Sequence, residues 1–300
     1  MAGCNRAVRR IARTKTGPAG VTGRRLPGEK MGIRVADIVD ILEGIAPPQL
    51  AEKWDNIGLQ LGHPDWPAET VWVALDPTEA VVTAACREGV NLLITHHPLI
   101  FSPLKSIDFS TPMGRLLHHA IDHRLAVVAA HTNLDSAEGG LNDLLARKVG
   151  LVDCRPLVPA VKMGADEGKG QGLGRVGSLP RPIPLGRLAR DIKSALAAGV
   201  VRMVGDETLS VSTVAVCTGS GSSLMDAFFS SGAQVYVSGD LRYHDARDAE
   251  ARGAGLIDVG HFAGEHMVVD DLTRRLSDRL SAQGVAVSAC SIEKDPFQSI

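Results

Sequence analysis

The sequence predicts an α/β protein made of two similar α/β portions with mostly parallel sheets. From residue 31 onward, short β-type apolar runs alternate with helical patterns, as parallel α/β folds require. The 300 residues are 44% hydrophobic and 22% charged, so the chain can bury a sizeable core. Its apolar stretches reach about ten residues, short of the roughly 18 to 20 that a bilayer span needs. We therefore expect a folded chain with no membrane partner.

The first predicted portion covers residues 31–153 and begins with a helix. Apolar residues follow helical spacing over 35–45, and Pro47 and Pro48 end this helix. The runs expected as strands are 71–75, 91–95 and 125–130, and the patterns expected as helices are 78–89, 112–124 and 141–150. This alternation indicates parallel strands joined by crossover helices.

The second predicted portion covers residues 154–300. It opens with a segment rich in proline and glycine, so we expect a boundary or an irregular connection near 153–175. The expected strands are 213–217, 234–239 and 255–260, and the expected helices are 184–199, 223–232, 242–253 and 270–282. The second portion therefore repeats the architecture of the first.

Residues 1–30 are expected to be a disordered basic leader. They hold eight Lys and Arg residues against the single acid Glu29, which leaves 24 basic and 33 acidic residues in the body. A basic arm can contact nucleic acid, but the well-patterned segment that opens at Met31 favours a leader that is disordered or precedes the true start. The lack of serine in 1–30 disfavours an organelle transit peptide. Nucleic acid is not the expected partner.

The five cysteines are far apart and odd in number, with no CxxC spacing. This pattern suggests neither a disulfide framework nor a thiolate zinc site. A reducing compartment is the default for such a chain, so we expect a cytoplasmic protein.

Three histidine motifs carry the strongest functional signal. THHPLIF (95–101), HTNLD (131–135) and GHFAGEH (260–266) each follow directly on a strand-like run. Because the carboxyl ends of parallel strands line the ligand crevice of open α/β sheets, residues far apart in sequence can meet there. The motifs therefore predict one site at the carboxyl ends of the strands.

The residue types in these motifs indicate metal ions. Adjacent His96 and His97 would point to opposite sides of a continuing strand, which suits two neighbouring ions. His261 and Glu265 are one helical turn apart, and Asp135 adds a second carboxylate. Imidazoles and carboxylates without a thiolate are typical of Zn, Mn, Fe, Co or Ni sites. We expect two divalent metal ions.

The chain resembles a known family, the GTP cyclohydrolase 1 type 2 homologues, also called the Ngg-one-interacting-factor-three-like proteins. The resemblance runs from about Met31 to the C-terminus. It is carried by the segments WDNIGLQLG (54–62), LLITHHPLIF (92–101), HTNLD, GLGRVG (172–177), CTGSGSS (217–223), SGDLRYHDA (238–246) and GHFAGE.

The resemblance implies a dinuclear metal centre in a ring-like homohexamer. It places His97 and Asp135 on one ion and His96 and His261 on the other. Glu265 would then bridge both ions. All five of these residue types are present at the matching positions of this chain.

Other signals are weaker. GLGRVG fits the GxGxxG string, but no helix follows, so a dinucleotide site is not expected and the segment is interpreted as the glycine-rich start of a strand. CTGSGSS can present backbone N–H groups to an anion or be a plain tight turn. The histidines 118, 119 and 123 offer a rival ligand set on one helix, for which a solvated helix face is the favoured interpretation.

The predicted site indicates a dinuclear metal-dependent hydrolase that acts through a metal-bound hydroxide. The resemblance, together with the possible anion loop, implies a nucleotide-like or phosphorylated small molecule as its substrate. His131 and His244 are the candidate catalytic residues for proton transfer. His131 can equally be a ligand or an outer donor, and His244 can equally be a surface residue. The alternative is a metal-binding regulatory or scaffold protein without turnover. A third possibility is nucleic-acid processing.

Overall fold

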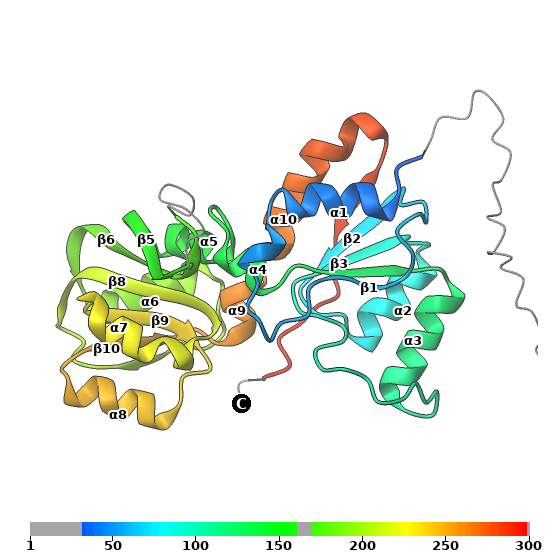
Figure 1. The fold of residues 1–300 in the computed structure, drawn as a ribbon. Coiled ribbons are helices and arrows are strands. Elements are labelled where there is room, and N and C mark those ends of the chain that lie inside the picture. The colour runs from blue at the N-terminus through cyan, green and yellow to red at the C-terminus, as the bar shows by residue number, and fades with distance from the viewer. Residues whose placement is uncertain (1–31, 161–169, 299–300) are drawn as a thin grey trace, which may run out of the picture. The chain divides into compact units, whose positions relative to one another are not determined.

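The computed structural model describes residues 32–160 and 170–298, so the expected leader at 1–30 lies outside the described residues. The described chain contains two sheets with helices on both faces, which confirms the predicted α/β class (Figure 1). Within these ranges no helix is long and apolar enough to cross a membrane.

The first sheet has five strands in the order β1-β4-β3-β2-β11. Their bounds are β1 (Gly58–Leu61), β2 (Thr70–Ala74), β3 (Leu92–Thr95), β4 (Ala126–Ala129) and β11 (Ala286–Ala289). The pairs β4-β3, β3-β2 and β2-β11 are parallel, and only β1 runs antiparallel to its neighbour.

The second sheet has six strands in the order β5-β6-β8-β9-β10-β7. Their bounds are β5 (Val152–Pro159), β6 (Gly172–Pro184), β7 (Arg202–Val204), β8 (Ser210–Ser220), β9 (Val235–Gly239) and β10 (Gly255–Asp258). The strands β8, β9 and β10 are parallel, and antiparallel strands flank them on both sides.

The helices lie between these strands along the chain. Their bounds are α1 (Val35–Glu43), α2 (Glu79–Arg87), α3 (Pro112–Asp122), α4 (Thr132–Ser136), α5 (Leu141–Val149), α6 (Leu185–Ala195), α7 (Met225–Ser231), α8 (Tyr243–Ala251), α9 (His261–Glu265) and α10 (Met267–Leu280). The longer predicted helices are all present. The short helices α4 and α9 begin directly after two of the histidine motifs' strands.

The strands of the first sheet are apolar on both faces because both faces are covered. Leu92 and Ile94 pack with α1 and α10, whereas Leu93 between them packs with α2 and α3. Side chains alternate across a strand, so a continuous apolar run is the expected sequence of such a doubly covered strand. The second sheet follows the same rule, with α5 and α6 on one face and α7 and α8 on the other.

The prediction of an irregular connection near 153–175 is partly wrong, because β5 and β6 pair in this region as two antiparallel strands. The prolines of β5 are tolerated since this strand lies at the edge of the sheet, where a missing N–H costs no ladder bond. Residues 161–169, between the two strands, lie outside the described residues.

The C-terminal end of the chain returns to the first sheet. β11 pairs in parallel with β2, and α10 packs against the core of that sheet. The predicted division between residues 153 and 154 remains a proposal about domains, and the sheets themselves do not divide the chain at one position.

Arg175 is a charged residue inside the second core, where it is 1% exposed. Its Nε donates to Asp143 Oδ1 at 2.6 Å, and its Nη2 donates to Asp143 Oδ2 at 2.8 Å. The carbonyls of Gly172, Gly174 and Ala137 accept its other bonds. The guanidinium therefore ties β6 to α5 and to the segment after α4.

We expect Arg175→Met to lower the free energy of unfolding by about 3 kcal/mol, because it leaves the Asp143 carboxylate and three carbonyls without their donor. Urea unfolding followed by circular dichroism measures this loss. Arg181→Met is the matched control, since Arg181 lies exposed on the same strand. An equal loss in both variants would contradict the structural role.

Candidate metal centre

Histidines and carboxylates meet where strands of the two sheets end. His96 and His97 follow β3, and Asp135 lies in α4 directly after β4. His261 and Glu265 are the first and last residues of α9, which follows β10 of the second sheet. Figure 1 shows α4 and α9 between the two sheets. The predicted convergence at strand ends is therefore present in the fold.

The side chains form two ligand groups that share one carboxylate. His96 Nε2 lies 3.8 Å from both Asp135 Oδ1 and Glu265 Oε1. The Nε2 atoms of His97 and His261 each lie 3.0 Å from Glu265 Oε2 and 3.3 Å from one another. In each group the ligand atoms lie within 4.8 Å of one another, as a metal site requires.

The grouping differs from the one that the resemblance implies. The structure places His96 with Asp135 and His97 with His261, whereas the resemblance implies the opposite partners. The reason lies in the second ring nitrogen of each histidine. His96 Nδ1 bonds to Ala130 O beside β4, and His97 Nδ1 bonds to Asp76 after β2, so the two rings leave the strand in different directions. Glu265 stands between the two groups, as implied.

Each imidazole near the centre has an oxygen acceptor at Nδ1. His97 bonds to Asp76 Oδ1 at 2.7 Å and His261 to Asp240 Oδ2 at 2.8 Å. His131 bonds to Asp55 Oδ1 at 2.8 Å in the same way. An oxygen acceptor keeps the hydrogen on Nδ1, which leaves the lone pair on Nε2 for a metal ion.

The residues fit the binding of divalent metal ions. Glu265 is 3% exposed and His96 is 2% exposed, so both are buried polar groups. In the described part of the chain, His96 Nε2 and Glu265 Oε2 have no hydrogen-bond partner of acceptable geometry. Such buried atoms are costly unless something binds them. Ions held by these nitrogen and oxygen atoms would satisfy both.

Gly219, at the end of β8, makes room for the shared carboxylate. Its φ of +62° lies in the left-handed region, and a Cβ added there would overlap Glu265 Oε1. The preceding residue, Thr218, donates to Asp135 Oδ1 at 3.2 Å. The end of β8 therefore holds both carboxylates of the centre.

The electrostatics couple the imidazoles to the carboxylates. Burial raises the pKa of Glu265, but the imidazoles of His261, His96 and His97 outweigh it and hold the pKa well below its usual range. Burial lowers the pKa of His97, yet Asp76 and Glu265 raise it to about 10. Glu265 also raises the pKa of His261 to about 9 against the effect of burial. Without metal, the imidazoles of His97 and His261 are therefore protonated at neutral pH.

The two candidate catalytic residues have different surroundings. His131 lies beside the centre, with its ring centroid 5.2 Å from that of His96 and 5.6 Å from that of His97. His244 is exposed on the first turn of α8, and its ring contacts that of Tyr243. Among the described residues no contact joins His244 to the centre, so its role remains a prediction.

The sequence reasoning missed the carboxylates that orient the histidines, Asp55, Asp76 and Asp240. Asp76 follows β2 and Asp240 follows β9, so each stands at a strand end like the histidine motifs themselves. A search for every polar residue just after a predicted strand would have found these two. Asp55 precedes β1 and gave no such signal.

The CTGSGSS loop has the surroundings of a tight turn. Its short 3-10 helix spans Gly221–Leu224, and Ser222 Oγ donates to Asp245 Oδ2 at 2.5 Å. A carboxylate at that position repels an anion. This favours the tight-turn interpretation over a phosphate loop.

A pocket of about 740 Å³ opens onto the centre. His97 and His261 line it together with Asp76 and Asp240, and Arg202 and Phe297 line it farther out. The C-terminal segment forms one wall, since Glu293 accepts from the backbone N–H of Asp76 at 2.8 Å and from that of Leu75 at 2.9 Å. The pocket has the size of a small-molecule site.

The family model DUF34/NIF3, described as NGG1p interacting factor 3, matches residues 33–296. A Streptomyces coelicolor protein named GTP cyclohydrolase 1 type 2 homolog is 37% identical over 77% of this chain and 81% of its own. A Clostridium perfringens protein of the same name is 32% identical over 89% of this chain and 100% of its own. The crystal structure of a Bacillus cereus protein related to NIF3 has a TM-score of 0.83 at 28% identity, covering 91% of this chain and 100% of that one.

We expect Asp240→Asn to weaken divalent metal binding by about 10 to 100-fold, because it removes the charged acceptor that fixes His261. Metal titration of the chelator-stripped protein, with Zn²⁺ or Mn²⁺, measures the affinity. Asp248→Asn, a change of the same kind at an exposed position of α8, is the control. Unchanged affinity in Asp240→Asn would show that Asp240 does not orient a ligand.

We expect the metal-free protein to lose stability as the pH rises from about 6.5 to about 10. The raised pKa values of His97, about 10, and of His261, about 9, give a contribution that is complete below the unfolded value of about 6.5 and is lost as the pH passes the folded values. Thermal melting in chelator at several pH values measures this slope.

The double variant His97→Gln/His261→Gln is the control for this slope. It keeps the other titrating groups of the chain but lacks the two shifted imidazoles. A melting temperature that falls equally steeply in the wild type and in the double variant would contradict the assignment.

Proposed function

This chain belongs to the DUF34/NIF3 family, and from that premise we propose that it is a dinuclear metal-dependent hydrolase acting on a nucleotide-like or other phosphorylated small molecule. The observation that carries the proposal is Glu265, a buried carboxylate shared by two groups of nitrogen and oxygen ligands. Two divalent ions bound at such a centre supply Lewis-acid polarisation and acidify water.

The residues proposed to hold the two ions are those of the two groups. His96 and Asp135 would hold one ion, His97 and His261 the other, and Glu265 both. His131 also has a ring nitrogen within 4.8 Å of nitrogens of His96 and His97, so it is a candidate for a further metal ligand. Zn, Mn, Fe, Co and Ni all suit imidazole and carboxylate donors.

His131 is the better placed of the two proton-transfer candidates. Asp55 holds its Nδ1, so Nε2 is free to take a proton beside the centre. Burial raises the pKa of Asp55, but its bonds with His131 and Thr132 outweigh this and lower the pKa to about 2. The carboxylate thus stays ionised at neutral pH and stabilises the imidazolium that forms at His131.

The surroundings of the centre support a substrate with a planar ring and a charged group. Trp54 lies with its ring centroid 6.1 Å from that of His131 and 5.8 Å from that of Phe101, and it is 59% exposed. Exposed aromatic faces of this kind stack on heterocyclic bases. In the pocket that opens onto the centre, Arg202 adds a cationic group, which forms an ion pair with Asp258.

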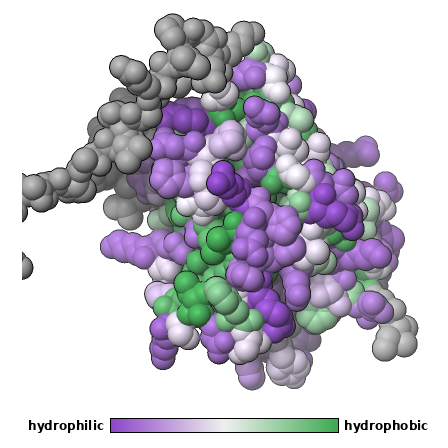
Figure 2. Space-filling model, turned by 90° about the vertical axis from the view of Figure 1, so that its right-hand side faces the viewer, coloured by the Kyte–Doolittle hydropathy of each residue, from purple (hydrophilic) through white to green (hydrophobic). Residues whose placement is uncertain are grey.

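The proposed assembly is a homohexamer. The β3-α3 connection carries several large apolar side chains that are exposed in the single chain: Phe101, Leu104, Ile107 and Phe109. Figure 2 shows apolar side chains gathered low on the face that carries α3, among polar ones. Contiguous exposed apolar surface is typical of an interface, which here would be formed with further copies of the chain. A cytoplasmic location is likewise part of the proposal.

A second candidate function is a metal-binding regulatory or scaffold protein without turnover. The same exposed apolar side chains favour it, since they would serve a binding surface whether or not the centre is catalytic. The two functions differ in whether the loaded centre turns a substrate over.

We expect the metal-loaded protein to hydrolyse at least one member of a panel of GTP, cyclic nucleotides and phosphomonoesters. Glu265→Gln should abolish this turnover while the circular dichroism spectrum stays that of the wild type, because the change removes the shared charge without changing the side-chain shape. Product release measured by chromatography tests both. A blank panel at full metal occupancy would favour the scaffold.

His131→Asn distinguishes proton transfer from metal binding in the same assay. A loss of kcat of about 100-fold or more with full metal content supports proton transfer. A loss of metal content would instead make His131 a ligand. His244→Asn is the comparison variant, because its ring lies on the exposed first turn of α8.

A further inference from the structure

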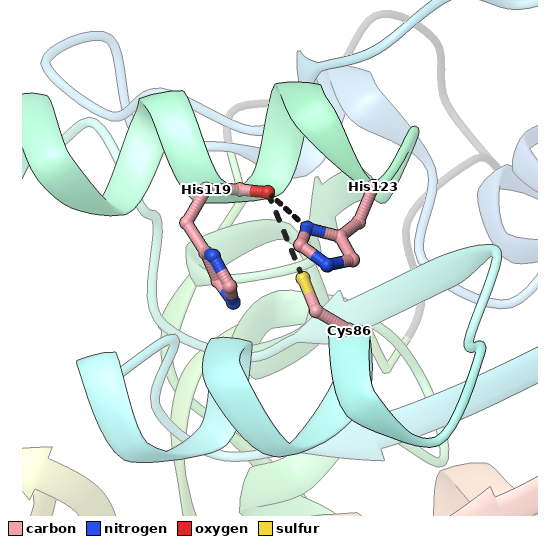
Figure 3. Close-up of side chains that lie close together, drawn as sticks. All are labelled: Cys86, His119 and His123. Carbon is pink, nitrogen blue, oxygen red and sulfur yellow. Dashed lines mark hydrogen bonds between the residues drawn. The ribbon is translucent and has the colours of Figure 1, made fainter.

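A cysteine and two histidines meet away from the dinuclear centre. Cys86 is near the end of α2, His119 is in the last turn of α3, and His123 is the residue that caps α3. One ligand atom of each lies within 4.8 Å of the other two. Figure 3 shows the thiol of Cys86 between the two imidazole rings. The sequence indicated His119 and His123 as part of a rival ligand set but gave no sign of Cys86, because the cysteine is on a different helix.

The hydrogen bonds of the cluster leave a metal-binding nitrogen free. His123 Nδ1 bonds to the carbonyl of His119 at 2.8 Å, and a carbonyl can only accept, so the hydrogen lies on Nδ1. The lone pair is therefore on His123 Nε2. The two rings are close, with centroids 4.4 Å apart, and Cys86 Sγ has only a distant contact of 3.9 Å with the same carbonyl.

The position in the fold favours a cation. α2 joins β2 to β3 and α3 joins β3 to β4, and these strands are parallel. Both helices therefore end beside the amino ends of the strands of the first sheet. Helix C-termini carry partial negative charge and stabilise cations. The dinuclear centre lies at the carboxyl ends of the same strands. The two sites therefore share no residue.

The spacing of the three side chains is close to that of a zinc site. With Zn–N near 2.0 Å and Zn–S near 2.3 Å, tetrahedral ligands are about 3.3 to 3.6 Å apart. The three ligand atoms of the cluster lie within 4.8 Å of one another, so each separation exceeds the tetrahedral value by at most about 1.5 Å. Cys86 is buried at 6% exposure, whereas His123 is exposed and His119 is partly exposed. Because the thiol is buried and the histidines are nearer the surface, the histidine side chains would move toward Cys86 to close this difference.

We propose that Cys86, His119 and His123 form a mononuclear site for Zn²⁺, separate from the dinuclear centre. The Cys86 thiolate and two imidazole nitrogens provide three ligands, and water fills the fourth position on the exposed side. Binding releases the thiol proton to solvent, so one Zn²⁺ exchanges for one H⁺. A thiolate with two imidazoles selects Zn²⁺ over Mn²⁺ or Mg²⁺.

Cobalt titration of the full-length, chelator-stripped protein tests the site. Co²⁺ bound to a thiolate gives a near-ultraviolet charge-transfer band, and the ligand groups of the dinuclear centre contain no thiolate. We expect the band to appear in the wild type and in the control Cys154→Ser, where an exposed cysteine is replaced. We expect Cys86→Ser to lose the band and one equivalent of bound Zn²⁺.

Because Cys86 is buried, the surface variant His119→Gln/His123→Gln tests the same site without disturbing the core. It should lose the band and one equivalent of Zn²⁺ while its melting temperature in chelator stays that of the wild type. A band that is absent from the wild type at saturating Co²⁺ overturns the proposal. So does a band that persists in Cys86→Ser or in the histidine double variant.

Discussion

The candidate centre depends on one repeated interaction, a hydrogen bond that fixes the outer nitrogen of each imidazole. Asp76, Asp240 and Asp55 accept these bonds from three histidines, and the carbonyl of Ala130 accepts the fourth. In His96, His97 and His261 this bond orients an otherwise rotatable ring so that Nε2 lies near Glu265 or Asp135. Without these acceptors, the buried carboxylates would face imidazoles of undefined direction. The directions of the histidine ligands therefore depend on the oxygen atoms that accept their Nδ1 hydrogen bonds.

Burial sets the cost of this arrangement. Glu265 and Asp135 are both buried, and carboxylates in such surroundings destabilise the fold unless positive charge lies nearby. In the metal-free chain, protons on His97 and His261 provide that charge. Divalent ions would take over the same role, because they bind the nitrogens that the protons occupy. The free energy of folding and the affinity for metal are thus coupled through the same atoms.

The sequence predicted the fold class, most helices and the residues that converge, because these depend on local patterns. The apolar runs at 91–95 and 125–130 end at two of the histidine motifs. Because parallel strands have their carboxyl ends on the same side of the sheet, the two motifs are then expected to lie close together. It did not predict β1, β7 or β11, which are short and partly polar, or the edge strand β5, whose sequence contains two prolines. The partition of ligands that the resemblance implies differs from the grouping in the structure, since the direction of His96 depends on its bond to Ala130 O, a contact made by tertiary structure. Cys86 and His119 are likewise close together only because α2 packs against α3, which the sequence does not show.

The tie between Glu293 and the backbone of Leu75 and Asp76 has a consequence for how the protein is made. Asp76 orients His97, yet its own position is fixed from near the far end of the chain, 217 residues later in sequence. A nascent chain that has not yet exposed Glu293 lacks this support, although its first sheet can already have formed in large part. Maturation of the pocket should therefore wait in biosynthesis until Glu293 has emerged from the ribosome.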